Sequence, residues 1–276
     1  MVKTFSAAAA LAGVLLTFQG CGSSDQVTSF PVEERFARAK ALFDKGDYLE
    51  AINEFTVITL QFQGSQFAGD AQFYLGECRF NRGDYVLAAF EYGVLKRGYP
   101  ASPRVPEAQY KIALSYYHLS PRPSLDQQYT VKAIDELQSF IEYFPSNPLA
   151  ADADAKIKEL NAKLARKVYE AARQYVTLQH YKAALRYFDD LIERFHDTDY
   201  APLAYLDKVD VLIERKRYAE AAAELARFLG RYPNSVLRGR AEELKLQIEK
   251  ESKGTIVAPG VGAAPLTSDS PASREH

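Results

Sequence analysis

A short segment recurs five times along this chain, and the recurrence limits what the chain can fold into. The copies are KGDYLEAINEF (45–55), RGDYVLAAFEY (82–92), VKAIDELQSF (131–140), HYKAALRYF (180–188) and RYAEAAAEL (217–225). Tyr48 and Tyr85 are 37 residues apart, and so are Tyr181 and Tyr218. A fixed period of this size is typical of arrays in which one supersecondary unit stacks on the next.

Each copy predicts a helical hairpin. The first helix ends near Gly46 or Gly83, where glycine accepts a left-handed cap, and the second begins at the tyrosine. An alanine then recurs where the second helix must approach the first: Ala51, Ala88, Ala133, Ala184 and Ala221. This is the tetratricopeptide pattern, with a period longer than the usual ~34 residues. We therefore expect an all-α superhelix of five helical hairpins plus a C-terminal capping helix.

The spacing departs from the period at two places. The third copy carries an insertion around SPRPSLDQQY (120–129), whose prolines predict a loop, whereas 149–178 lacks Gly and Pro and predicts a first helix lengthened by about four turns. We expect repeats one to three in 31–146. Repeats four and five, with a closing helix, are expected in 147–252, followed by a disordered tail at 253–276 rich in Gly, Pro, Ser and Ala.

The N-terminal segment differs from the rest. Residues 1–20 hold one early cation, Lys3, and then an apolar stretch too short to span a bilayer, which predicts a signal peptide. Cys21 follows a small residue, as in the bacterial lipobox, in which this thiol is acylated. Residues 21–30 would then be a tether reaching about 30 Å at ~3.3 Å per residue. Cys78, the other cysteine, is expected to be a small buried residue without chemistry.

Charge and motifs exclude several classes of function. The chain has 34 basic and 36 acidic residues, a net charge of -2, so nucleic acid is not an expected partner. Its four histidines form no metal-binding or nucleophile motif, and no Gly-rich phosphate loop is present. DADAK (152–156) lacks the glycine turn of a calcium loop. We expect no catalytic site, no metal and no cofactor, and a function in binding other proteins.

An aromatic stripe follows the first helices of the first three repeats. Its members are spaced by seven residues within each helix: Phe36 and Phe43, Phe73 and Phe80, and Tyr110 and Tyr117. If these side chains face the groove of the superhelix, they predict binding of an extended client peptide with aromatic side chains. A shift of one residue in the alignment would instead place them in the hairpin core. Both interpretations stay open at this point.

With the lipobox, five repeats, the long fourth-repeat helix and the segment YPASPRVPEAQYKIALSYY (99–117), the chain resembles the BamD family of lipoproteins of the outer-membrane β-barrel assembly machine. The resemblance implies a lipid anchor at the periplasmic face of the outer membrane. It implies that the N-terminal repeats bind unfolded outer-membrane protein precursors and that the C-terminal repeats dock on a BamA-like barrel protein, beside other lipoproteins of the machine. In this family an arginine on the second helix of repeat four is implicated in that docking; Tyr187 aligns with its position here, and Arg186 is adjacent, so the resemblance implies a partner-binding site at these two residues.

Two other functions are compatible with a helical repeat array. One is a periplasmic coordinator of cell-envelope synthesis of the YbgF/CpoB kind, whose members usually carry a coiled-coil segment and no lipid. No heptad pattern is predicted here. The other is an envelope enzyme, which would need a cluster of reactive residues that the sequence does not display.

Overall fold

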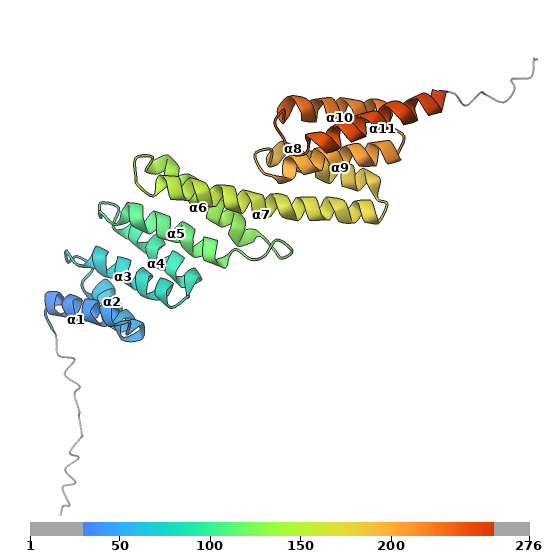
Figure 1. Ribbon diagram of the computed structural model, residues 1–276. Helices are drawn as coiled ribbons and strands as arrows, with labels where there is room; N and C mark the ends of the chain where they lie inside the picture. Colours follow the sequence, from blue (N-terminus) through green and yellow to red (C-terminus); the bar gives the residue numbers. More distant parts are fainter. Residues whose placement is uncertain (1–29, 257–276) are drawn as a thin grey trace, which may run out of the picture.

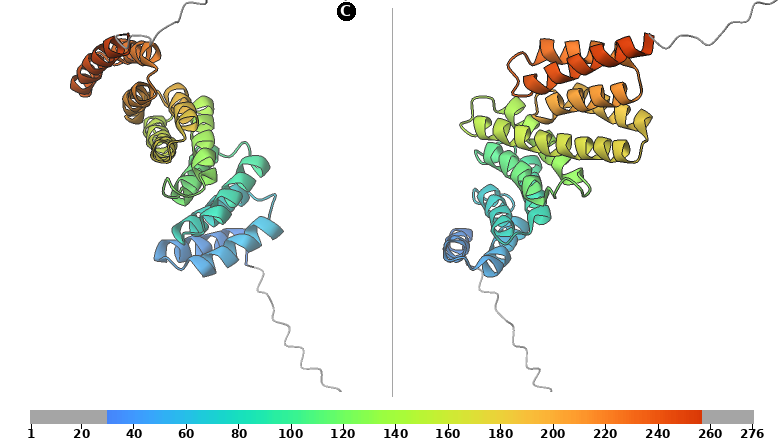
Figure 2. Two further views of the ribbon diagram at one scale, coloured as in Figure 1. Left: turned by 90° about the vertical axis from the view of Figure 1, so that its right-hand side faces the viewer. Right: turned by 45° about the vertical axis from the view of Figure 1, so that its right-hand side comes forward.

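The computed structural model describes residues 30–256, and within them the chain is entirely α-helical. The helices follow one another as a stack of antiparallel hairpins (Figure 1). Their bounds are α1 Val32–Lys45, α2 Tyr48–Gln61, α3 Ala68–Asn81, α4 Tyr85–Gly98, α5 Val105–Leu119, α6 Gln128–Tyr143, α7 Ala150–Thr177, α8 Tyr181–Arg194, α9 Tyr200–Glu214, α10 Tyr218–Arg231 and α11 Arg238–Ile256. The expected superhelix of five hairpins closed by a capping helix is confirmed, and Figure 2 shows its curved, elongated shape.

Local backbone chemistry sets the hairpin turns. Gly46 and Gly83 adopt φ of 84° and 80°, a left-handed conformation that glycine accepts without a Cβ clash. The fourth and fifth hairpins make the same turn with Gln179 and Lys216, at φ of 58° and 57°. These two residues carry a conformational cost that glycine avoids. The second helices of these four hairpins begin at the recurring tyrosine, as the repeat predicts.

The recurring small and large residues form the core. Ala51, Ala88, Ala133, Ala184 and Ala221 are all fully buried. One turn further along each second helix lies a buried large side chain: Phe55, Tyr92, Leu137, Phe188 or Leu225. Burying one such side chain contributes about 1.5–3 kcal/mol. The stack is thus held together hairpin by hairpin, with each first helix after α1 packed between two second helices.

Helix α7 joins the two ends of the array. It has 28 residues where α1 has 14, which confirms the predicted lengthening. Its first half contributes Ala153 and Leu160 to the core formed by α5 and α6. Its second half contributes Ala172 to the core formed by α8 and α9. One continuous helix therefore belongs to two successive cores and sets their relative positions.

The insertion in the third hairpin is an ordered loop at 120–127 that lies against α7. The buried amide of Gln127 donates to the carbonyl oxygens of Arg122 at 2.9 Å and Leu125 at 3.0 Å. From α7, Lys167 donates to the carbonyl oxygen of Leu125, and Lys163 donates to Ser120 Oγ at 2.9 Å. The loop is thereby closed on itself and attached to the long helix.

The capping helix α11 packs Ala241, Leu244 and Ile248 into the last core and continues to Ile256, four residues past the predicted boundary at 252. The predicted signal peptide, the lipidation site Cys21 and the rest of the tail lie outside the described residues. Within residues 30–256, none of the helices combines the length and the apolar character that crossing a bilayer requires.

Candidate functional site

The six aromatic residues of the predicted stripe differ in how far their side chains are buried. Phe73 is 2% exposed and packs against Tyr92, with ring centroids 5.8 Å apart. Tyr110 is 6% exposed and packs against Phe140 at 5.2 Å. These two side chains therefore fill space between helices, as the core interpretation expects. Phe36, Phe43, Phe80 and Tyr117 are only half-buried and keep part of their rings at the surface.

The four half-buried rings form two groups. Phe36 and Phe43 both contact Tyr74 of the next first helix, at centroid distances of 6.2 and 5.2 Å. Phe80 and Tyr117 both contact the ring of His118, at 5.4 and 5.9 Å. The sequence pattern identifies the four rings because they repeat. Tyr74 and His118, which contact them, have no aromatic residue at the equivalent positions of the other repeats.

Cations of the first helices cover the stripe, a feature that the sequence pattern did not reveal. Each of four rings has a cation close to its centroid. The distances are 5.4 Å for Lys40 over Phe43, 4.9 Å for Arg104 over Phe73, 4.8 Å for Lys111 over Phe80, and 5.2 Å for Lys156 over Tyr117. A cation within about 6 Å of a ring centroid is attracted to the ring face. The first-helix surface thus presents aromatic rings capped by cations, each of which is also paired with a carboxylate.

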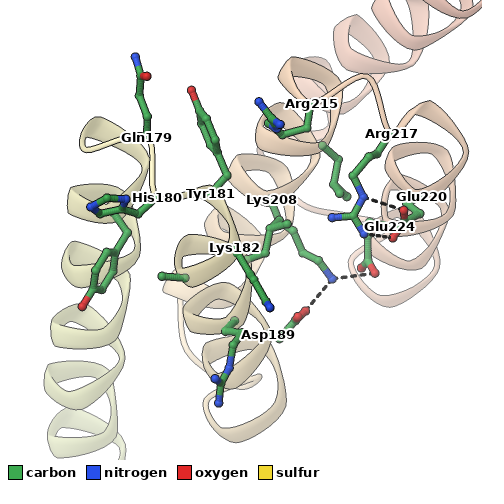
Figure 3. Close-up of a pocket in the computed structure, with 15 residues that line it drawn as sticks. Gln179, His180, Tyr181, Lys182, Asp189, Lys208, Arg215, Arg217, Glu220 and Glu224 are labelled. Carbon is green, nitrogen blue, oxygen red and sulfur yellow. Dashed lines mark hydrogen bonds and ion pairs between the residues drawn. The ribbon is translucent and has the colours of Figure 1, made fainter.

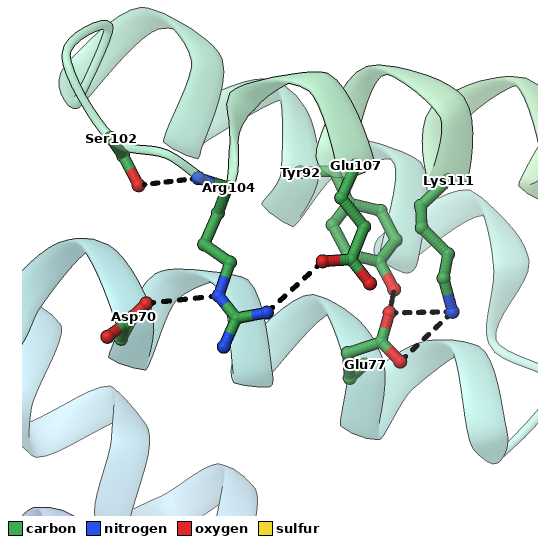
Figure 4. A network of polar contacts seen from close by, with 7 residues as sticks. All are labelled: Asp70, Glu77, Tyr92, Ser102, Arg104, Glu107 and Lys111. Atoms are coloured by element: carbon green, nitrogen blue, oxygen red, sulfur yellow. Dashed lines mark hydrogen bonds and ion pairs between the residues drawn. The ribbon is translucent and has the colours of Figure 1, made fainter. Parts of the chain in front are cut away.

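A polar network links α3, α4 and α5 beneath this surface (Figure 4). The carboxylate of Glu77 accepts hydrogen bonds from the Tyr92 hydroxyl and from Lys111 Nζ, the latter at 2.9–3.0 Å. Glu77 is 13% and Lys111 21% exposed at the side chain. Burial, followed by the charge of Glu77, raises the pKa of Tyr92, so its hydroxyl stays protonated and remains a donor.

Arg104 makes a second bridge between the first helices. Its guanidinium donates to Asp70 on α3 at 3.3 Å and to Glu107 on α5 at 3.1 Å (Figure 4). The same guanidinium covers Phe73. An arginine guanidinium that hydrogen-bonds to two carboxylates and lies over an aromatic ring is held in one orientation. It therefore fixes the spacing of α3 and α5 at this surface.

The first half of α7 continues the same surface with tyrosine–carboxylate pairs. Tyr110 donates its hydroxyl to Asp152, and Tyr117 donates to Glu159 at 2.7 and 2.9 Å. The hydrogen bond to Glu159, followed by burial, raises the pKa of Tyr117 to about 12. The hydrogen bond from Tyr110 lowers the pKa of Asp152. DADAK (152–156) is thus the start of a helix whose carboxylates face tyrosines.

A cleft of about 1290 Å³ opens at the other end of the array, between α8, α9 and α10 and the end of α7 (Figure 3). Its lining includes Tyr175, Tyr181, Lys182, Arg186, Asp189, Lys208, Arg215 and Glu224. Lys208 lies in its floor, 9% exposed, with Asp189 at 2.6 Å and Glu224 at 2.8 Å. This buried cation is matched by two carboxylates and joins three helices.

Three other cations of the cleft have no such partner. Lys182, Arg186 and Arg215 have no carboxylate within 4.0 Å among the described residues, although Arg215 lies over the Tyr181 ring at 5.2 Å. Arg186, one of the two residues expected to bind a partner, lines the cleft. Tyr187, the other, lies beside it, is 38% exposed and packs on Tyr175 with ring centroids 5.1 Å apart. Lys182 and Arg215 were not predicted, because nothing in the repeat distinguishes them from surface residues.

The described residues contain no group of three or more His, Cys, Asp or Glu side chains placed to hold a metal ion. Cys78 is fully buried, and burial, followed by the charge of Glu77, raises its pKa to about 12. A thiol in this state is a poor nucleophile. His118 keeps an exposed face but contacts the rings of Phe80, Tyr85 and Tyr117, and partial burial, followed by the charge of Lys156, lowers its pKa.

Comparison with known protein families identifies the family to which this chain belongs. A family model described as "YfiO: Outer membrane lipoprotein" matches residues 29–209, which is well over half of the 276-residue chain. The chain belongs to the YfiO outer membrane lipoprotein family. A tetratricopeptide-repeat model also matches residues 204–235, which hold most of α9 and all of α10.

Two curated relatives carry the same name. "Outer membrane protein assembly factor BamD" of Rickettsia prowazekii (strain Madrid E) is 26% identical over 228 residues, which cover 82% of this chain and 91% of the relative. The protein of that name from Caulobacter vibrioides is 25% identical over 183 residues, 66% of this chain and 60% of the relative. Among solved structures, the "TPR2AB-domain:pHSP90-complex of yeast Sti1" is 15% identical, covers 82% of this chain and 85% of that chain, and has a TM-score of 0.41.

The YfiO match includes the first-helix surface and ends within α9, so it covers only part of the cleft. Its last matched residue, Val209, follows Lys208 in the cleft floor. The residues that close the cleft on the α10 side fall in the tetratricopeptide match instead: Arg217, which precedes α10, and Glu220 and Glu224 within it. The family match therefore includes the first-helix surface and the α7–α8 side of the cleft and leaves out the α10 side.

Proposed function

We propose that this chain is a non-catalytic assembly factor for outer-membrane proteins, anchored by acyl chains on Cys21 at the periplasmic face of the outer membrane. It binds unfolded outer-membrane protein precursors and docks on a BamA-like barrel protein, beside other lipoproteins of the assembly machine. The YfiO family match over 29–209 carries this proposal. The names of the two BamD relatives support it.

The first-helix surface is the proposed site for the precursors. Phe36, Phe43, Phe80 and Tyr117 offer partly exposed rings, and each ring group is rigid because its members pack on one another. Rigid aromatic surface gives binding energy at a low cost in side-chain entropy. Phe73 and Tyr110, the other two members of the stripe, contribute from beneath by supporting this surface.

The cleft between α8 and α10 is the proposed docking site for the BamA-like partner. Lys182, Arg186 and Arg215 supply three cations without carboxylate partners, and Tyr187 adds an exposed ring beside them. Tyrosine and arginine are the side chains that most often dominate protein interfaces. Helices α8, α9 and α10, which line the cleft, lie at the opposite end of the array from α1, α3 and α5, which carry the aromatic stripe, so one chain can hold a precursor and a partner at once (Figure 1).

Site-specific photo-crosslinking tests the precursor site. A photoreactive amino acid at Phe80 is expected to capture unfolded barrel precursors in native envelopes, and one at Tyr143, an exposed residue of α6, is the matched control. Capture of cell-wall synthases from Phe80 would favour the YbgF/CpoB-like alternative. Equal capture of precursors from both positions would contradict a specific site on the first helices.

Charge reversal tests the docking cleft. Arg186→Glu combined with Lys182→Glu is expected to reduce co-purification of the BamA-like protein, because two of the three unpaired cations become repulsive to an acidic partner. Lys245→Glu, on the exposed side of α11, is the matched control. Undiminished co-purification of the double variant would assign docking to another surface.

A further inference from the structure

The second helices of the first three hairpins expose apolar side chains at equivalent positions. Leu49, Val86 and Val131 each lie two residues before the buried alanine of their hairpin, and they are 55%, 51% and 46% exposed. On α4, Leu87 follows Val86 directly and Phe90 lies one turn further along the helix; they are 45% and 59% exposed. We call these five residues the outer apolar row. They lie on the second helices, whereas the aromatic stripe belongs to the first helices.

The row stops where the third hairpin ends. The equivalent positions of the fourth and fifth hairpins hold Lys182 and Ala219. Packing does not require the row, because the alanines and large residues of the hairpin core lie on the opposite side of the same helices. An exposed apolar patch that recurs at the repeat period marks a surface that meets something less polar than water.

The position of the row along the chain indicates its occupant. Residues 22–29, between Cys21 and the first described residue, can reach about 28 Å at ~3.5 Å per residue. Helix α1 has 14 residues and spans about 21 Å, so α2 and α4 lie within reach of the tether. With acyl chains on Cys21, the outer apolar row would lie near the bilayer, as would Phe30, which is 37% exposed at the start of the described residues.

We infer that the outer apolar row lies against the lipid surface and holds the N-terminal hairpins flat on the membrane. This inference rests on the lipid anchor of the proposed function. Five side chains are few beside the roughly 20–30 residues that each partner contributes to a stable protein interface. They suffice for a tethered contact, since a short tether raises the effective concentration of the second site to the millimolar range.

This placement has a consequence for the array. With the second helices of the N-terminal hairpins on the membrane, the first-helix surface with Phe80 and Tyr117 remains open. The fourth and fifth hairpins hold Lys182 and Ala219 in place of the large apolar side chains of the row, and helices α8 to α11 lie at the other end of the array (Figure 1). The apolar row therefore orients the array, while the acyl chains supply the attachment.

Fluorescence quenching by lipid tests the contact directly. The chain contains no tryptophan, so Phe90→Trp introduces a single reporter on the row. The chain from Cys21 to His276 is coupled through Cys21 to maleimide lipid in vesicles of phosphatidylethanolamine and phosphatidylglycerol with brominated acyl chains. Cys78 does not compete, because it is buried and its pKa is raised to about 12. Since the anchor is made chemically, the result does not depend on lipidation in the cell.

The expected result is that Phe90→Trp loses most of its emission on brominated vesicles and that its spectrum shifts to the blue. Leu246→Trp, 66% exposed on α11, is the matched control and is expected to keep its emission. Adding Leu49→Ser and Leu87→Ser to Phe90→Trp should restore most of the lost emission, with helix content unchanged by circular dichroism.

Two outcomes would overturn the inference. The first is equal emission of Phe90→Trp and Leu246→Trp on brominated vesicles. The second is a blue shift of Phe90→Trp that depends on protein concentration and occurs without quenching, which would assign the row to a contact between protein chains. Failure of the precursor and docking tests under "Proposed function" would leave this measurement unaffected.

Discussion

The ring of Tyr92 packs directly on the backbone of α3 at Gly76. A Cβ atom on Gly76 would lie 2.6 Å from Cε1 of Tyr92, closer than real contacts allow. The equivalent pairs are Ala39 with Phe55 in the first hairpin and Ala113 with Leu137 in the third. Tyr92, the largest of the three opposing side chains, thus faces the smallest residue. Its ring is fully buried, and its hydroxyl bonds to Glu77.

We predict that Gly76→Ala destabilises the protein by about 1–3 kcal/mol, the usual cost of overfilling a packed core. The loss is expected although alanine favours a helix over glycine by about 1 kcal/mol, because the buried ring cannot move aside. Urea unfolding followed by circular dichroism measures the change. Gly76→Ala with Tyr92→Leu recreates the pair of the third hairpin and should show a favourable coupling energy. Strict additivity of the two single variants would contradict this packing.

The aromatic stripe should divide into residues that support the fold and residues that bind. Phe73→Ala removes a 2%-exposed ring and is expected to cost about 3–5 kcal/mol, whereas Phe80→Ala, which is half-buried, should cost clearly less. Phe80→Ala should nevertheless weaken binding of a peptide with aromatic side chains. Thermal unfolding and fluorescence anisotropy separate the two effects. Equal loss of stability in both variants would mean that Phe80 is a core residue.

The loop at 120–127 should depend on the side chain of Gln127. Its amide donates to the carbonyl oxygens of Arg122 and Leu125, and its oxygen accepts from Thr130 at 2.7 Å. We expect Gln127→Ala to remove these hydrogen bonds, at a cost of about 0.5–1.5 kcal/mol for each bond, and to speed amide exchange in the loop. Hydrogen–deuterium exchange with mass spectrometry compares this loop with the hairpin turn at Gly83. Unchanged exchange would mean that Lys167 and Lys163 alone hold the loop.

The ring cluster around His118 should make stability depend on pH. Burial and the charge of Lys156 lower the pKa of His118 in the fold below its ordinary value of about 6.5, so the neutral ring is favoured when the protein is folded. That contribution is fully present above about pH 6.5 and is lost as pH falls through the folded pKa. We expect the melting temperature to fall between about pH 7 and pH 5.5, where histidine titrates. His118→Phe should flatten the fall, and an equal fall in both proteins would assign it to other groups.

Much of the fold follows from local patterns. The turns at Gly46 and Gly83, the starts of the second helices at tyrosine and the buried alanines were all predicted, because each depends on backbone conformation or on close helix approach at a fixed spacing. The length of α7 was predicted because 149–178 holds no residue that breaks a helix. These features depend on local sequence and are independent of how the hairpins pack against one another.

The depth of the aromatic stripe was decided by tertiary structure. Phe36 and Phe73 occupy equivalent positions, yet Phe36 lies on the outermost helix, while Phe73 is enclosed by Tyr92 and covered by Arg104, the residue that precedes α5. Burial depends on neighbours at both sides of a helix, and a periodic sequence does not specify how many neighbours each repeat has.

The chain's sequence by itself therefore determined the hairpins, their number and the glycine caps at Gly46 and Gly83, since these rest on short-range preferences. Tertiary structure alone decided which side chains of a repeated pattern became core and which stayed at the surface. It also brought together the cleft in which Lys208 lies between Asp189 and Glu224. Those three residues come from three helices, and a buried cation is stable only where stacking places carboxylates on it.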